Sequence, residues 1–189
     1  MTATAEPAVY LLNHVELYHR PEEGELAALL FETMGCTVVD VTKQFGSSST
    51  YLCVYPGPVE GDPLNNAIYL TTLREEQPLE KLLEQRKETD PELRAALEES
   101  TLGVPRPGYA MHFGLRYSSF EELESVMSRL QDQLPAELVG RVTIQAPFSY
   151  PMPALGREVM QSFVHTDLLG TGLFPFGQLI ELQAQRPIA

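Results

Sequence analysis

The sequence predicts an α+β fold built from two β-α-β-β-β modules in tandem, which form a curved mixed sheet cup. Two echoes along the chain predict the duplication. Residues 12–18 (LNHVELY) are matched by residues 111–117 (MHFGLRY), and residues 66–70 (NAIYL) are matched by residues 178–182 (QLIEL). A repeat of this length is typical of two supersecondary units that each need the other to bury one face. We therefore expect one compact domain with a first module at 8–75, a charged helical connector at 76–107 and a second module at 108–186.

The first module begins with a strand at 9–18, where apolar and polar residues alternate. Pro21 and the two glutamates after it favour the start of a helix, because proline suits the first turn and carboxylates suit the positive end of the helix dipole. Leucines at helical spacing continue to Met34, and Gly35 is placed to end the helix. Strands are then expected at 36–41, 51–55 and 67–72, separated by loops at 46–50 and 56–63.

The connector is rich in charge, and its leucines recur at helical spacing. Asp90 before Pro91 is typical of a helix cap, so two short helices are expected over 76–102. The second module then repeats the plan of the first. A strand at 109–117 leads into a helix with a capping box at Ser119–Glu122. Further strands are expected at 141–146, 161–167 and 179–183, with loops at 147–153 and 170–177.

The composition excludes several classes of function. The formal net charge of −13 repels phosphate backbones, so nucleic acid is not an expected partner. No apolar stretch approaches the roughly 20 residues that span a bilayer, and the first residues lack the features of a signal peptide. We therefore expect a cytoplasmic protein that does not act at a membrane. Cys36 and Cys53 lie in apolar strand contexts and are expected to be reduced core thiols.

The alternation within each strand assigns side chains to two faces. In the last strand Ile180 and Leu182 face the helix, so Glu181 faces the opposite side. The same reasoning applied to the other echoed strands gives one polar or aromatic residue for each. These four residues share the sheet face that the helices leave uncovered, where they can converge in a cup: His14, Tyr69, His112 and Glu181.

With these elements in place, the chain resembles the vicinal oxygen chelate superfamily, which includes glyoxalases, extradiol dioxygenases and bleomycin-resistance proteins. The resemblance rests on residues 13–17, 111–115 and 177–183 in the paired β-α-β-β-β plan. It implies a divalent metal bound at the positions of His14, Tyr69, His112 and Glu181. Tyr69 departs from the glyoxalase pattern, in which a carboxylate or similar ligand is usual. The remaining set of two histidines and one glutamate resembles the iron site of extradiol dioxygenases and the manganese site of fosfomycin thiol transferases.

Two imidazoles and one carboxylate on one side of an octahedral ion leave positions open for substrate oxygens and for dioxygen or water. We therefore expect His14, His112 and Glu181 to hold Fe(II) or Mn(II), with Tyr69 donating a hydrogen bond to a substrate oxygen. Taken singly, each of these residues is better explained as an ordinary polar residue on a strand, and the metal site is predicted from their matched positions together. His165 is either an acid or base beside the metal or an exposed histidine at a strand end.

Three functions are consistent with these residues, and the sequence does not decide among them. The first is a dioxygenase-like oxidoreductase acting on a small molecule that chelates through oxygen, such as a catechol or hydroxyketone. The second is a lyase or isomerase of the glyoxalase or epimerase type on the same metal site. The third is a metal-free protein that binds or sequesters a small molecule. A monomer and a homodimer are both consistent with each of the three functions. We further expect His19 to be a surface residue. Arg116 either binds an anionic group of the substrate or lies at the rim of the cup. The segment 170–177 is either a lid over the site or a hairpin.

Overall fold

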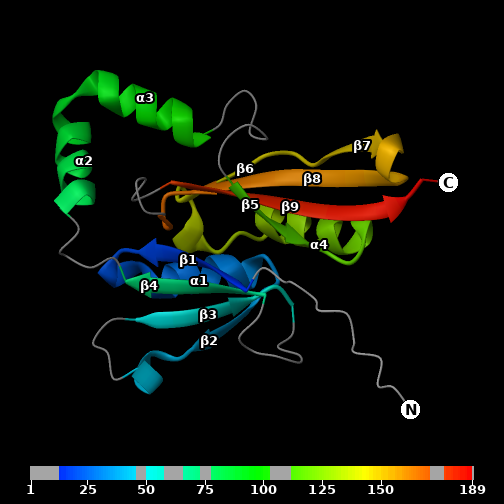
Figure 1. Cartoon of the computed structure of the whole chain (residues 1–189), viewed down its shortest axis with the longest axis horizontal. Coiled ribbons are helices and arrows are strands. Elements are labelled where there is room, and N and C mark those ends of the chain that lie inside the picture. Colours follow the sequence, from blue (N-terminus) through cyan, green and yellow to red (C-terminus); the bar gives the residue numbers. More distant parts are fainter. Residues whose placement is uncertain are drawn as a thin grey trace, which may run out of the picture.

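The two halves of the chain repeat one order of elements, and the second half carries one additional strand (Figure 1). The computed structural model describes residues 13–45, 50–57, 66–72, 78–102, 112–170 and 177–188. The first half contains β1 (His14–His19), α1 (Gly24–Thr33), β2 (Thr37–Asp40), β3 (Tyr51–Tyr55) and β4 (Ala67–Thr72). The second half contains β5 (His112–Arg116), α4 (Phe120–Asp132), β6 (Val142–Ile144), β7 (Phe148–Met152), β8 (Arg157–Thr166) and β9 (Gln178–Pro187). The connector forms α2 (Pro78–Thr89) and α3 (Pro91–Leu102), so the predicted α+β fold is confirmed.

Each module folds into its own mixed sheet, and in both the first strand lies parallel beside the last. The strand order is β1-β4-β3-β2 in the first sheet and β5-β9-β8-β6 in the second. The register places Glu16 beside Tyr69 in the first sheet and Gly114 beside Glu181 in the second. The predicted first residues of β1 and β5, the loop after β3 and most of 170–177 lie outside the described residues.

The helices begin and end where the sequence signals predict. α1 follows a short turn of 3₁₀ helix at Pro21–Glu23 and ends at Thr33. Gly35 lies just after this end and has a φ of +88°, a backbone conformation that residues with a side chain rarely adopt. At the start of α4, the Ser119 side chain accepts a hydrogen bond from the Glu122 backbone N–H at 3.1 Å. The Glu122 carboxylate in turn accepts from the Ser118 backbone N–H at 2.8 Å, which completes a capping box shifted by one residue.

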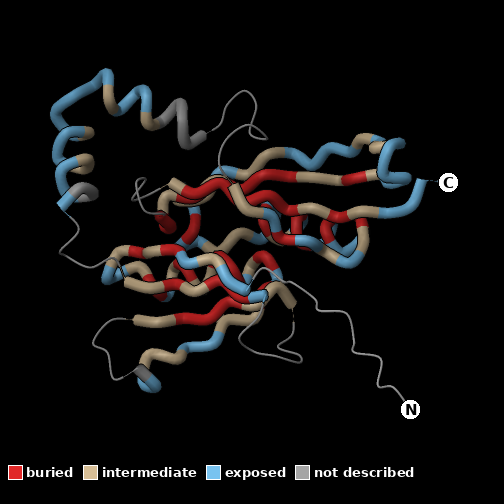
Figure 2. Tube along the Cα trace, viewed as in Figure 1, coloured by how far each residue is buried: buried red, intermediate tan, exposed pale blue. Residues whose placement is uncertain are grey.

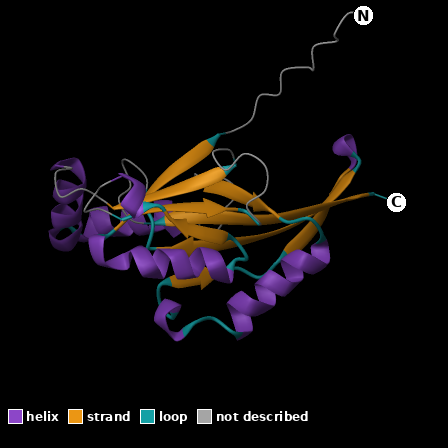
Figure 3. Cartoon of the chain, turned by 90° about the horizontal axis from the view of Figure 1, so that it is seen from below, coloured by secondary structure: helices purple, strands orange, loops and turns teal. Residues whose placement is uncertain are grey.

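One face of each sheet packs against a helix, α1 in the first module and α4 in the second. In Figure 3 helices run along the lower side of the strands, while other helical segments lie beyond the ends of the strands. The buried residues in Figure 2 follow the sheets and the inner sides of α1 and α4, whereas α2 and α3 are largely exposed. A single core cluster joins residues of both modules, among them Leu17, Phe31, Leu130 and Leu182. We call the opposite face, which carries His14, Tyr69, His112 and Glu181, the cup face.

The second module has one strand more than predicted. The proline-rich segment 147–153 was expected to be a loop, but Phe148–Met152 forms β7 and pairs antiparallel with the first half of β8. β8 is 10 residues long, and β6 pairs only with its last three residues, so its first half needs another partner. In the described residues β7 pairs with no other strand, and an edge strand of this kind tolerates Pro151 because one side of it forms no ladder.

The modules are joined by backbone as well as by side chains. Tyr18 and Gly170 exchange two backbone hydrogen bonds of 2.9 Å. The Tyr117 hydroxyl donates to the Met34 backbone carbonyl at 2.8 Å, and Arg129 Nε donates to the Thr33 carbonyl at 3.3 Å. These contacts link the end of α1 to the second module, so the two halves form one packed body.

Both cysteines are buried and free, as predicted. Burial raises the pKa of the Cys36 thiol to about 12, so the thiol stays protonated near neutral pH. In the part of the chain that the structure describes, no helix has the length and apolar character needed to span a membrane.

Candidate functional site

The centre of the candidate site is a contact between His112 and Glu181. His112 Nε2 lies 3.0 Å from Glu181 Oε2 on the cup face of the second module. The side chain of Glu181 points away from the buried Ile180 and Leu182, as the alternation predicts, yet Glu181 is only 8% exposed. Gly114 lies directly beside Glu181 in the register and carries no side chain that would cover the carboxylate. A histidine and a carboxylate that are far apart in the sequence thus form a close pair on the open face.

Two glutamines hold the other oxygen of this carboxylate. Gln183 Nε2 donates to Glu181 Oε1 at 2.6 Å, and Gln161 Nε2 donates to the same oxygen. Gln185 Nε2 in turn donates to Gln183 Oε1 at 2.5 Å. The carboxylate is therefore oriented by two amides on one oxygen while its second oxygen faces His112. The sequence reasoning missed these glutamines, although Gln183 and Gln185 follow Glu181 at the two-residue spacing of one strand face.

The first module presents aromatic rings at the equivalent positions. The His14 ring stacks on Tyr69, with centroids 4.6 Å apart and planes inclined by 27°. Tyr51 lies next to Tyr69, with ring centroids 5.7 Å apart. His14 Nδ1 is also 2.5 Å from Asn13 Oδ1, although His14 is exposed. The structure thus brings His14 and Tyr69 together in the first module, as it does His112 and Glu181 in the second.

The sequence predicts that His14, His112 and Glu181 bind one metal ion together. Among the described residues, no three His, Cys, Asp or Glu side chains are grouped closely enough to hold a metal ion. The structure brings two of the three residues, His112 and Glu181, into contact. The participation of His14 stays a prediction.

His165 lies on the same face as the central pair. It is opposite Leu179 in the register of β8 and β9, and His112 flanks Leu179 on the other side. Its Nε2 atom is buried and has no hydrogen-bond partner among the described residues. Desolvation lowers the pKa of His165, and the charge of Asp167 offsets this only in part. The imidazole is therefore held in its neutral form, which suits a proton acceptor.

This lowered pKa predicts a specific loss of stability in acid. The unfolded chain binds a proton at His165 below about pH 6.5, whereas the folded chain binds it only at lower pH. The His165 contribution to stability is thus present above about pH 6.5 and is lost as the pH falls through the folded pKa. We expect His165→Gln to lose less stability than the wild type between about pH 7.5 and pH 5.5, measured by urea unfolding. Equal losses in the two proteins would contradict the prediction.

His19 differs from its prediction. It was expected at the surface, but it is fully buried, at the end of β1. The reason is its parity, because His19 continues the apolar face formed by Val15 and Leu17. Its Nδ1 lies 2.7 Å from the Arg20 carbonyl oxygen, and the His19 ring packs so closely on Gly24 that a Cβ there would lie 3.0 Å from Cε1. His19 thus belongs to the core and not to the cup face.

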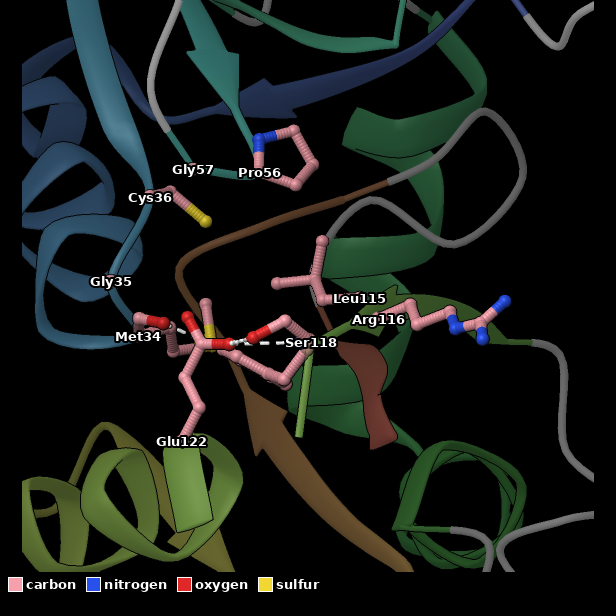
Figure 4. Close-up of a pocket in the computed structure, with 10 residues that line it drawn as sticks. Met34, Gly35, Cys36, Pro56, Gly57, Leu115, Arg116, Ser118 and Glu122 are labelled. Carbon is pink, nitrogen blue, oxygen red and sulfur yellow. Dashed lines mark hydrogen bonds between the residues drawn. The ribbon is translucent and has the colours of Figure 1, made fainter. Parts of the chain in front are cut away.

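A pocket of about 320 Å³ lies at the junction of the modules (Figure 4). Its walls come from the turn after α1, the residues after β3 and the turn between β5 and α4. The buried Cys36 thiol and Glu122 line it, but the Glu122 carboxylate is engaged by Ser118, whose hydrogen bonds lower its pKa. Arg116 also lines it and extends away from the other labelled side chains. None of the five candidate site residues borders this pocket, so we do not assign the candidate chemistry to it.

No family model matches the chain. No curated protein matches its sequence. Among solved structures, the chain is similar to the crystal structure of a "putative glyoxalase family protein" from Bacillus anthracis. The two share 11% sequence identity over 96% of this chain and 99% of that chain, with a TM-score of 0.45.

Proposed function

We propose that the chain is a metal-dependent enzyme of the vicinal oxygen chelate type, which binds a small molecule through two adjacent oxygens. The observation that carries the proposal is the 3.0 Å contact between His112 Nε2 and Glu181 Oε2 on the cup face. Two ligand atoms about 2.1 Å from an octahedral ion, at right angles to each other, lie about 3.0 Å apart. The pair therefore fits two neighbouring ligands of one divalent ion.

The surroundings of Glu181 support the same proposal. Carboxylates that bind metals are usually held by further hydrogen bonds, which fix the direction of the ligating oxygen. Gln161 and Gln183 bind Oε1 of Glu181 and leave Oε2 toward His112. We propose that Fe(II) or Mn(II) is bound by His112 and Glu181 and that His14 from the first module completes the set.

A bound ion would act as a Lewis acid on the two substrate oxygens and, if it is iron, would also allow reaction with dioxygen. In this proposal the Tyr69 hydroxyl donates a hydrogen bond to a substrate oxygen. His165, held neutral by burial, accepts a proton from the substrate. We take a dioxygenase-like oxidoreductase as the leading function and a lyase or isomerase of the glyoxalase or epimerase type as the alternative. Oxygen consumption with a catechol would separate the two.

The test is the metal content of the purified chain after anaerobic loading with Fe(II) or Mn(II) and removal of the excess. We expect about one ion per chain in the wild type, and its loss in His112→Ala and in Glu181→Gln. Glu158→Gln is the matched control, because Glu158 pairs with the exposed Arg186 at the far end of β8. His14→Ala tests the third ligand. A wild-type chain that takes up neither ion would overturn the metal site.

One observation favours a second candidate, a metal-free protein that binds a small molecule. Glu181 accepts hydrogen bonds from Gln161 and Gln183 and contacts His112, so its carboxylate is satisfied by the protein alone. Ligand binding that persists in protein stripped of metal by a chelator would support this candidate.

A further inference from the structure

The pocket at the junction of the modules, here called the junction pocket, is lined in part by residues of the shared core (Figure 4). Met34, Cys36 and Leu115 line it, belong to the cluster that joins both modules, and are each at most 9% exposed. Met34 and Cys36 come from the first module and Leu115 from the second. The volume of about 320 Å³ is sufficient for a small molecule. An apolar group held there would contact both halves of the chain.

The Glu122 carboxylate, which also lines the junction pocket, has hydrogen-bonding capacity to spare. The backbone N–H and the hydroxyl of Ser118 both donate to Oε2 of Glu122. Oε1 of Glu122 accepts no hydrogen bond from the residues that the structure describes. The bonds from the Ser118 side chain and backbone lower the pKa of Glu122, so the carboxylate is ionised near neutral pH. The junction pocket thus combines apolar walls with an anionic acceptor.

The positive charges near the junction pocket are directed elsewhere. Arg116 extends away from the other labelled side chains (Figure 4). Arg129, whose charge also acts on Glu122, donates to the Thr33 carbonyl oxygen at 3.3 Å and to the Ser125 hydroxyl at 3.4 Å. The formal net charge of −13 favours the approach of a cation over that of an anion. A ligand that donates to Glu122 should therefore carry a positive charge.

We infer that the junction pocket is a second ligand site, which takes a small amphipathic cation with its apolar body against the core residues and its ammonium group at Oε1 of Glu122. An ammonium group is a donor without an acceptor, and its bond to a carboxylate is stronger than a bond between neutral groups. Burial of the apolar body removes apolar surface of ligand and pocket from water. Because the ligand contacts both modules, its binding stabilises the folded chain. The site is separate from the His112 and Glu181 pair and does not depend on a metal ion.

The test compares two probes that differ only in their polar group, cyclohexylmethylamine and cyclohexylmethanol, near neutral pH. We expect titrations followed by nuclear magnetic resonance to show the amine binding the wild type about five- to tenfold more tightly than the alcohol. Glu122→Gln should remove this preference, because glutamine also serves in a capping box but carries no charge. Glu124→Gln is the matched control, because Glu124 is an exposed residue of α4 outside the junction pocket, and it should keep the preference.

Nuclear Overhauser effects between probe and protein locate the bound ring. We expect effects from the cyclohexyl protons to the methyl groups of Met34 and Leu115, both of which line the junction pocket. Cys36→Met enlarges a side chain that borders the same space and should weaken the binding of both probes at least about fivefold. The Overhauser effects are measured on the wild type, so they test the location even if Cys36→Met does not fold.

Each part of the inference has its own contradicting result. A wild type that binds neither probe would overturn the site. Equal affinities for amine and alcohol, or a preference that survives in Glu122→Gln, would overturn the role of Glu122 and the cationic class of ligand. Overhauser effects that reach neither Met34 nor Leu115 would overturn the location. A preference that is lost in Glu122→Gln and kept in Glu124→Gln, with effects to the core methyl groups, supports the inference.

Discussion

Replacing Phe31 with alanine should lower the free energy of unfolding by about 4 kcal/mol. Phe31 lies in α1, is fully buried, and belongs to the core cluster that joins both modules. Its truncation removes a large apolar ring and leaves a cavity that the surrounding side chains fill only in part. For a chain of this length the loss corresponds to a fall in melting temperature of roughly 10 °C.

Urea unfolding followed by circular dichroism measures this loss, and Leu82→Ala provides the matched control. Leu82 lies in α2 and is 52% exposed, so its truncation should change the free energy of unfolding by no more than about 0.5 kcal/mol. Similar losses in the two variants would mean that Phe31 does not lie in the shared core.

The second large effect is expected at an ion-pair network between the modules. Arg141 Nη2 lies 2.7 Å from Glu23 Oε1 of the first module, and its Nε lies 2.8 Å from Asp167 Oδ1. Glu23 also pairs with Arg20 at 3.1 Å. Burial alone would lower the pKa of Arg141, but its hydrogen bonds with Asp167 and Glu23 outweigh that effect and raise it. The guanidinium therefore stays charged and bridges two carboxylates from different halves of the chain.

We expect Arg141→Ala to cost about 2 to 3 kcal/mol, because the largely buried Glu23 carboxylate loses its closest partner. Arg141→Lys keeps the positive charge but loses the forked geometry of the guanidinium, so its stability should lie between those of the wild type and Arg141→Ala. Lys87→Ala removes one member of a partly exposed pair in α2, Lys87 with Glu84 at 3.4 Å, and should cost about 0.5 kcal/mol or less. Thermal unfolding of the variants would show this order, and an Arg141→Ala as stable as Lys87→Ala would contradict it.

The sequence was sufficient for the modules and for the faces of their strands. Alternation on β9 places Ile180 and Leu182 in the core and Glu181 opposite them, and the structure agrees. The same two-residue spacing predicts that His112 shares the face of Glu181, and their side chains are in contact. Local periodicity carries this information because one face of each sheet is buried by a helix.

Other features depend on contacts between distant segments, which periodicity does not report. β7 exists because β8 is longer than β6, and the length of a strand partner cannot be read within the proline-rich segment itself. The bond from Gln161 to Glu181 joins adjacent strands, so the role of Gln161 appears only once the register is known. His19 was missed for another reason, because the turn signal of the following residues outweighed the parity of β1 in the sequence reading.

The single core beneath the two sheets has a consequence for how the molecule comes apart. Since α1 and α4 bury their apolar sides in one cluster, neither half retains a complete interior when the other opens. Melting should thus be cooperative, with one transition and not a separate one for each repeat. The duplicated halves therefore do not unfold independently, and a substitution that disrupts the packing of one half also destabilises the half that carries the other candidate histidine.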